Sequence, residues 1–465
     1  MKVEIWNDVN PPLPLLRLGE RGVGGRGIAE ISKPGGYYKK GNEKMRGMLR
    51  RNGVQAGFLM LLILSFSHPA HGQESRDVCV SCHQGLDGKL GEPVKGWNQS
   101  VHREAGVTCK NCHGGNSSIA KLAMNKAMGF LGTPKAQEIP ALCAKCHADV
   151  KKMRPYNLRT DQYAEYQISI HGQRLAKGDS RVATCSSCHG SHEVRKKNDP
   201  LSTVYHMKVP ETCAQCHADP KLMEPYKIPV DQLAQFQKSY HGRILFGKIP
   251  GKNPSLAPNC ATCHGIHGAT PPGVKEVAAV CGNCHTTIAR YFRQGPHEKA
   301  VQQTGIPKCI TCHGNHDIPY PSLDALTGDQ QGHCGSCHDP KSPPYAKAQE
   351  MKEVLQKTAQ AIQMNQQAIE RLKAKHLEVS ELEGKLTEVQ GKLTEAKPWT
   401  HAAEVKKLAE LTDQATKILQ SNQKLIAKFE EGVEERKKIG MILLSLIGLV
   451  IVFLYLKNES MKKRE

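Results

Sequence analysis

The C-terminal part of the chain carries the clearest periodic pattern of apolar positions. Leucine and valine recur every seven residues from Leu372 to Leu393, which is the seam of a helix that packs on another helix. Pro398 breaks this helix, and Thr400 is a suitable N-cap for a second one. Residues 346–438 are therefore expected to form a long antiparallel helical hairpin, or an oligomeric coiled coil that joins copies of the chain.

Two apolar runs indicate contact with a membrane. Residues 439–456 are apolar over 18 residues and have basic flanks, which predicts one transmembrane helix followed by a cytoplasmic tail, 457–465. Residues 45–72 combine a basic start, a short apolar run and small residues before Gln73, the pattern of a secretory signal peptide. We interpret residues 1–44 as an N-terminal extension that results from an upstream start codon.

The segment between these runs, residues 73–345, is defined by its cysteines. All 18 cysteines lie in nine C-x-x-C-H motifs, and none is left over. A zinc ribbon pairs C-x-x-C knuckles without a histidine after each one, and a thioredoxin-like motif occurs once, so neither explains the pattern. In c-type haem attachment, two thiols bond to one porphyrin edge and the following histidine becomes the proximal iron ligand. We therefore expect nine covalently bound haem c groups.

Each motif supplies one set of haem ligands. The expected thioether cysteines are Cys79, Cys82, Cys109, Cys112, Cys143, Cys146, Cys185, Cys188, Cys213, Cys216, Cys260, Cys263, Cys281, Cys284, Cys309, Cys312, Cys334 and Cys337. The expected proximal histidines are His83, His113, His147, His189, His217, His264, His285, His313 and His338.

A six-coordinate iron needs a second axial ligand, and the other histidines are numerous enough to provide it. The chain has 22 histidines, nine of them in the motifs. His68 and His71 fall in the signal peptide and His376 and His401 in the helical segment, so these four are set aside. The nine that remain are His102, His171, His192, His206, His241, His267, His297, His316 and His333.

These histidines recur with the motifs in an internal repeat. Residues 146–172 align without gaps with residues 216–242. Each of four units contains a short S-x-H motif (GPH in the last), a C-x-x-C-H-G motif and a plain C-x-x-C-H motif, and one half-unit, CVSCH, precedes them. In three units the C-x-x-C-H-G motif continues as CHG-x-H, but Asn116 takes the place of the second histidine in the first unit.

With these motifs, residues 79–338 resemble the multihaem c-type cytochromes with doubled C-x-x-C-H motifs. The resemblance implies electron transfer through mostly bis-histidine haems, and it implies these distal ligands: His102, His171, His192, His241, His267, His297 and His316. His206 and His333 complete the count but lie outside the repeated positions, so each could equally face solvent. Met153 and Met223 are expected to pack against haem rather than to bind iron.

The chain length limits how the haems are held. Residues 73–345 provide about 30 residues for each haem, too few for separate globular pockets. We therefore expect a mainly α fold with much irregular structure, in which stacked haems supply much of the core. A histidine three residues past His264 cannot easily reach the opposite face of the same porphyrin, so we expect His267 to bind the iron of a different haem.

Charge and targeting complete the functional interpretation. The net charge of +20 does not indicate nucleic-acid binding, because each haem brings two propionates for basic residues to pair with. We expect a single-pass protein of the bacterial inner membrane with its haem domain in the periplasm. Export agrees with the resemblance, because the similar cytochromes have their c-type haem attached outside the cytoplasm.

Two functional classes remain. In the first, the protein is an electron carrier between a membrane quinol-oxidising complex, or another cytochrome, and a periplasmic acceptor, with no catalytic residue. In the second, it is a multihaem reductase of the nitrite, hydroxylamine or tetrathionate type with one open haem iron. Nine spare histidines for nine haems favour the carrier.

Overall fold

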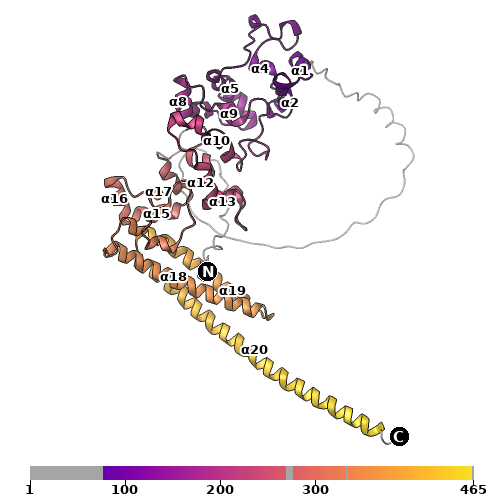
Figure 1. Cartoon of the computed structure of the whole chain (residues 1–465), viewed down its shortest axis with the longest axis vertical. Coiled ribbons are helices and arrows are strands. Elements are labelled where there is room, and N and C mark those ends of the chain that lie inside the picture. Colours follow the sequence, from indigo (N-terminus) through magenta and orange to yellow (C-terminus); the bar gives the residue numbers. More distant parts are fainter. Residues whose placement is uncertain (1–76, 269–275, 331–332, 463–465) are drawn as a thin grey trace, which may run out of the picture. The chain divides into compact units, whose positions relative to one another are not determined.

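The structure is a computed structural model that describes residues 77–268, 276–330 and 333–462. Every regular element in these ranges is helical, and no strand occurs among them (Figure 1). The predicted mainly α fold with much irregular structure is confirmed. The predicted signal peptide and the N-terminal extension lie outside the described residues.

Short helices separated by loops build the segment with the cysteine motifs. The α-helices are α1 (Val78–His83), α2 (Glu92–Asn98), α3 (Val101–Glu104), α4 (Cys109–His113), α5 (Ile139–His147), α6 (Val150–Met153), α7 (Gln162–Ile168), α8 (Ile170–Ala176), α9 (Cys185–His189), α10 (Val209–His217), α11 (Pro220–Met223), α12 (Gln232–Lys238), α13 (Tyr240–Leu245), α14 (Cys260–His264), α15 (Thr286–Gln294), α16 (Pro296–Thr304) and α17 (Cys309–His313). The 3₁₀ helices are η1 (Gly88–Leu90), η2 (Ala120–Leu122), η3 (Lys126–Met128), η4 (Ala136–Glu138), η5 (Arg154–Tyr156), η6 (Glu224–Tyr226), η7 (Pro254–Leu256), η8 (Val277–Asn283), η9 (Leu323–Leu326) and η10 (Cys334–Ser336).

The motif residues themselves set the bounds of the shortest helices. At the start of α4, the Asn111 side chain accepts a hydrogen bond from the backbone N–H of Thr108 at 2.7 Å, which satisfies a free donor of the first turn. At its end, Gly114 has a φ of 71°, and a Cβ there would lie 2.0 Å from the carbonyl oxygen of Gly129. Only glycine fits this conformation and this approach. The CHG sequence therefore stops the helix directly after the motif histidine.

The motif segment contains few buried apolar side chains. Within the described part of residues 77–338 they are Val94, Met153, Leu175, Met223, Leu245, Ala257 and Val280. Most of the other buried apolar residues belong to the C-terminal helices. The polypeptide alone thus supplies little core for this segment, which agrees with the expectation that bound cofactors supply the rest.

The C-terminal segment folds into three helices rather than the two of the predicted hairpin. These are α18 (Pro343–Lys373), α19 (Ser380–Ala396) and α20 (Val405–Lys462), with the 3₁₀ helix η11 (Lys397–Ala402) between the last two. The predicted heptad pattern covers the end of α18 and most of α19, so it gave no sign of the break between these two helices. The break is a turn in which His376 has a φ of 57°. Thr400 does not cap α20 as expected; its hydroxyl donates to the carbonyl of Lys397 within η11.

The three C-terminal helices pack on one another through their apolar faces. Helix α20 lies against both α18 and α19 (Figure 1). Leu372, Leu382 and Leu408 are fully buried in the shared core. Asn422 is also buried, and its amide donates to the carbonyl of Leu382 at 3.2 Å. Packing of these faces stabilises the helices far more than their intrinsic propensity does.

The last part of α20 has a different character. It contains an apolar stretch long enough to cross a membrane, and none of that stretch is buried. Residues 441–456 are exposed along the whole helix. Such a fully exposed apolar helix is unlike the core helix of a soluble protein and matches the length of a membrane span.

Candidate haem-binding sites

Eight of the nine motif histidines face a second histidine at nearly the same distance. The ring centroids in these pairs lie 6.0–6.2 Å apart. The pairs are His147 with His102, His113 with His192, His217 with His171, His189 with His267, His285 with His241, His264 with His316, His338 with His297, and His313 with His401. So narrow a range indicates one geometric requirement common to all eight.

This spacing fits two imidazoles on opposite sides of one metal ion. A metal–imidazole bond is about 2.0 Å long and the ring centroid lies about 1.1 Å beyond the nitrogen, so the two centroids should be about 6.2 Å apart. The two cysteines of each motif are free and none is buried, so thioether formation is open to them. The residues therefore fit haem c with two axial histidines.

The pairs follow two rules that the repeat alone does not reveal. Each S-x-H or GPH histidine faces the plain C-x-x-C-H histidine of its own unit, as His102 faces His147. Each CHG-x-H histidine faces the first motif of the preceding unit, as His267 faces His189. This agrees with the expectation that His267 reaches past its own motif. Consecutive units are thereby interlocked, because each supplies a ring to the one before it.

The serine of the S-x-H motif positions its histidine. Ser100, Ser169 and Ser239 are buried N-caps at the starts of α3, α8 and α13. The hydroxyl of Ser100 accepts from the backbone N–H of His102 at 3.1 Å. An N-cap of this kind contributes about 1 kcal/mol to helix stability. The serine thereby sets the first residue of the helix, and with it the position of the histidine in the first turn.

Burial keeps these imidazoles in the form that binds metals. The pKa of His102 lies below its usual value, first because the ring is buried and second because it faces His147. The pKa values of His171 and His241 are lowered for the same two reasons. A neutral imidazole has a free lone pair for a metal ion. The second ring nitrogen of His113 is also fixed, because Nδ1 lies 2.8 Å from the carbonyl oxygen of Gly132 and leaves Nε2 for the metal.

His401 is the site residue that the sequence interpretation missed. It was set aside as part of the helical segment, but its ring lies 6.2 Å from that of His313. The two ring planes differ by 25°, which lies between the 12–20° of the CHG-x-H pairs and the 30–64° of the S-x-H and GPH pairs. Because His313 belongs to the first motif of the last unit, His401 takes the place that a CHG-x-H histidine of a following unit would have.

The surroundings of His401 hold it against the motif segment. Trp399, also in η11, contacts Tyr291 of α15 with ring centroids 4.2 Å apart. A Cβ at Gly295 would lie 2.5 Å from the carbonyl oxygen of His401, so the two backbones meet at a glycine. Burial and the facing His313 lower the pKa of His401 to about 4. The interrupted helix at Pro398 was the one sequence signal that could have pointed to this residue.

His206 and His333 do not face a motif histidine in the described structure. Both ring nitrogens of His206 have other partners: Nε2 donates to the carbonyl of Ala257 at 2.8 Å, and Nδ1 accepts from the Asn259 amide at 3.2 Å. Because Asn259 caps α14, His206 supports a motif helix instead of binding a metal there. His333 precedes Cys334 as the N-cap of η10 and has its ring on the backbone of Gly328.

Met153 and Met223 are buried, with 7% and 5% of their surface exposed. The motif histidines that precede them, His147 and His217, already face His102 and His171. A methionine ligand is therefore not needed at either position, and packing is the role that agrees with the structure.

Neighbouring thiols connect the motifs in the order of the chain. The Cys143 thiol donates a hydrogen bond to Cys185, which raises the pKa of Cys143 and lowers that of Cys185. Interacting thiols of successive motifs are Cys79 and Cys109, Cys112 and Cys146, Cys143 and Cys185, Cys188 and Cys216, Cys213 and Cys260, Cys263 and Cys284, Cys281 and Cys309, and Cys312 and Cys334. Each interior motif thus has one cysteine beside the motif before it and one beside the motif after it.

The first motif differs from the other eight. The ring of His83 is oriented like a proximal ligand, since its Nδ1 lies 3.0 Å from the carbonyl oxygen of Leu90 and Nε2 is left for a metal. Among the described residues, however, no histidine ring faces it. Asn116 does not fill this position either, because its side-chain oxygen accepts from the backbone N–H groups of Ser118 and Ile119.

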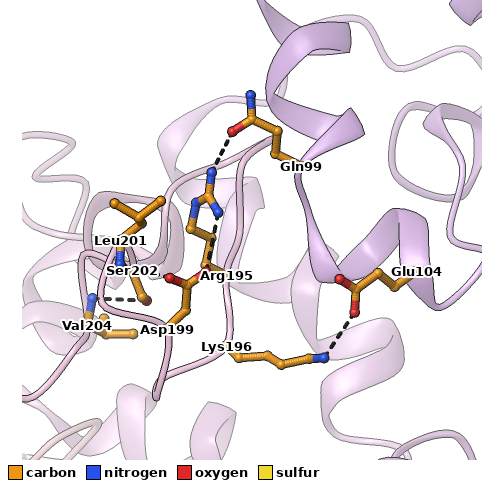
Figure 2. A network of polar contacts seen from close by, with 8 residues as sticks. All are labelled: Gln99, Glu104, Arg195, Lys196, Asp199, Leu201, Ser202 and Val204. Carbon is orange, nitrogen blue, oxygen red and sulfur yellow. Dashed lines mark hydrogen bonds and ion pairs between the residues drawn. The ribbon is translucent and has the colours of Figure 1, made fainter.

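A polar network fixes the loop that follows His192 (Figure 2). The guanidinium of Arg195 donates to the side-chain oxygen of Gln99 at the end of α2 (Figure 2). Beside it, the backbone N–H of Val101 donates to the carbonyl of Val194 at 2.9 Å. These contacts join the loop that follows His192 in the second unit to helices of the first unit, which contains His113.

Comparisons with known proteins agree with this site. Residues 101–226 match the family model described as Cytochrome c3. Over 202 residues the chain is 28% identical to the multiheme cytochrome MtrA of Shewanella baltica, covering 42% of this chain and 47% of MtrA. Over 121 residues it is 31% identical to the C-type polyheme cytochrome OmcC of Geobacter sulfurreducens, covering 25% of this chain and 14% of OmcC.

The chain spans less than half the length of either relative, and no solved structure matches it. The family match falls on the repeated units with their motif histidines, and both relatives carry several haems according to their names. Together with the histidine pairs, these findings support a multihaem c-type cytochrome.

Proposed function

We propose that the protein binds nine covalently attached haem c groups and relays electrons along them. Nine complete C-x-x-C-H motifs support this number, and the MtrA and OmcC relatives are multihaem cytochromes. Haem c supplies an iron that changes between the ferrous and ferric states, and the protein positions it and tunes its potential.

The residues of this chain would fix each iron from both sides. The motif histidines are the proposed proximal ligands, and seven distal ligands are those that the sequence predicts. His401 is the proposed eighth distal ligand, in place of His206 and His333. With two imidazoles on each of eight irons, these centres have no free position for a substrate, so they suit electron transfer rather than catalysis.

The order of transfer follows from the thiol contacts. Cysteines mark the porphyrin edge to which each haem is bonded, so neighbouring thiols bring the edges of neighbouring haems together. Among the interacting thiols described above, each motif interacts only with the motifs directly before and after it in the chain, from the first motif to the ninth. We propose that electrons move along the haems in the order of the chain, with the first and ninth motifs as its two ends.

The C-terminal helix suggests where the protein works. Residues 439–456 form the proposed single-pass anchor in the bacterial inner membrane, and residues 457–465 the cytoplasmic tail. The haem segment 73–345 and the helical segment 346–438 would then face the periplasm. The proposed partners are a quinol-oxidising membrane complex or another cytochrome as donor, and a periplasmic acceptor.

The single observation that carries this proposal is the set of eight histidine pairs at 6.0–6.2 Å. Intact mass of the purified mature chain tests the haem number, and nine haems are expected. Rapid-mixing spectroscopy with a reduced donor cytochrome and an oxidised acceptor tests the relay, and all nine haems should be reduced and reoxidised. Fewer than nine haems by mass, or haems that no protein donor reduces, would contradict the proposal.

The reductase alternative keeps one observation in its favour. His83 has no facing histidine among the described residues, so one iron would have an exchangeable position, as a reductase requires. The other eight motifs give no such opening.

A further inference from the structure

The two ends of the repeat differ in whether a histidine from outside the repeat faces one of their motif histidines. Each CHG-x-H histidine faces the histidine of the first motif in the preceding unit. No complete unit follows the last one, so no CHG-x-H histidine faces His313. His401 fills that place from outside the repeat. At the other end, His83 belongs to the half-unit that precedes the first complete unit, and no histidine ring of the described residues faces it.

The repeat rule predicts where that partner would lie. In the four complete units, the S-x-H or GPH histidine lies 41 to 46 residues before the plain motif histidine that it faces. The half-unit CVSCH corresponds to a plain motif, since its Cys79 interacts electrostatically with Cys109, the first cysteine of the next motif, as Cys143 does with Cys185. The same interval before His83 leads to residues 37–42, which contain no histidine.

The same rule explains Asn116. A CHG-x-H histidine in the first unit would serve the first motif of a preceding unit, and the half-unit has no such motif. His113 does not need Asn116, because His192 already faces it. The asparagine is therefore free to form the turn with Ser118 and Ile119, and the opening lies at His83 rather than in the first complete unit.

The surroundings of His83 are accessible. Residues 84–90 are exposed to solvent throughout, and Cys82 is exposed as well. Cys79 interacts with the next motif through Cys109, whereas Cys82 has no thiol partner among the described residues. A small solute can thus approach this end of the chain directly from solvent.

We propose that the haem attached at Cys79 and Cys82 is an open ligand-binding centre, with His83 as its one axial ligand from the described chain. Its sixth position takes a small exogenous ligand, such as a diatomic gas or an inorganic anion. This inference rests on the proposed function, because it requires nine attached haems, and it adds a binding site at one end of the electron path.

The test uses the mature full-length protein and two probes, carbon monoxide for the ferrous form and cyanide for the ferric form. Each should bind at one site per nine haems, and the ferric protein should show one high-spin iron that cyanide converts to low spin. Intact mass is measured on the same sample. Fewer than nine haems would contradict the proposed function, whereas nine haems without carbon monoxide binding would overturn this inference alone.

Two matched variants assign the site. Replacement of Cys79, Cys82 and His83 by alanine should remove one haem and all carbon monoxide binding. The control replaces Cys334, Cys337 and His338 at the opposite end, which should also remove one haem but leave the carbon monoxide site intact. Carbon monoxide binding that survives the first variant would place the open iron elsewhere.

One further variant addresses the histidines before the described residues. His68→Ala combined with His71→Ala should not change the spin state, since both fall in the predicted signal peptide. A high-spin signal that appears in this double variant and not in the parent would show that one of them binds the first iron, and would overturn the inference.

Discussion

The imidazole rings of His313 and His401 lie 6.2 Å apart although one belongs to the last cysteine repeat and the other to the helical segment beyond it. The proposed ligand role of His401 would make the helical segment part of a haem site rather than a spacer between haems and membrane. Trp399 and Gly295 hold the two parts together around it. If His401 is a haem ligand as proposed, the haem-binding residues extend beyond residue 345, where the sequence predicts the haem domain to end.

Replacement of His401 should open one iron without loss of haem. In His401→Ala, the iron at His313 loses its second imidazole, so a new high-spin ferric signal and one additional carbon monoxide site per chain are expected. The haem number by intact mass should stay the same, because both cysteines of that motif remain. His376→Asn is the control, since His376 lies in a turn with a φ of 57° that asparagine tolerates. An unchanged spectrum in His401→Ala would refute the assignment.

Truncation should separate the membrane anchor from this structural role. A chain that ends at Lys438 keeps η11 and the buried core of the three C-terminal helices, and it loses only the exposed apolar part of α20. We expect a soluble protein with the parent's haem number and carbon monoxide stoichiometry. A chain that ends at Ser342 lacks His401 and should bind at least one more carbon monoxide. Sedimentation of the first truncation with membranes would place the anchor elsewhere.

The repeat is where the sequence was most informative. The nine motifs, their cysteines and the seven repeated histidines are local patterns with fixed spacing, and local chemistry dictates their one-turn helices through Asn111, Gly114 and similar residues. Which histidine faces which motif depends on how units pack. That is why His267 could be expected to leave its own motif, while its partner His189 could not be named.

The residues that sequence reasoning misplaced lie outside the repeat. His206 completed a numerical count, but its two ring nitrogens are engaged by Ala257 and Asn259, contacts about 50 residues away in the chain that no pattern announces. His401 was set aside because it lies between two predicted helices and no repeat spacing relates it to a motif, although the helix break at Pro398 falls within η11.

His206 and His267 should respond to substitution in opposite ways. His206→Ala removes two partly buried hydrogen bonds, which should lower the free energy of unfolding by about 1–3 kcal/mol and leave the spin state as in the parent. His267→Ala should create a high-spin iron at His189. Thermal unfolding and ferric spectra of both variants provide the comparison. A high-spin signal in His206→Ala would mean that His206 is an iron ligand after all.

The loop after His192 offers a test of how one unit positions a ligand of another. Arg195 bonds to Gln99 and, at 3.3 Å, to Asp199, and its side chain is 20% exposed (Figure 2). Lys196 pairs with Glu104 at 3.0 Å, but both side chains are 65% exposed. Exposed pairs contribute little to stability, whereas loss of Arg195 removes its partly buried ion pair with Asp199 and its hydrogen bond to Gln99.

We therefore expect Arg195→Ala to lower the unfolding temperature by several degrees and to weaken the hold on His192. The readout specific to positioning is the affinity of the ferric protein for imidazole, which should compete for the iron at His113 when His192 is less firmly placed. Lys196→Ala is the matched control and should match the parent in both measurements. Equal effects of the two variants would mean that the loop is held by its backbone contact between Val101 and Val194, and that the Arg195 side chain does not position His192.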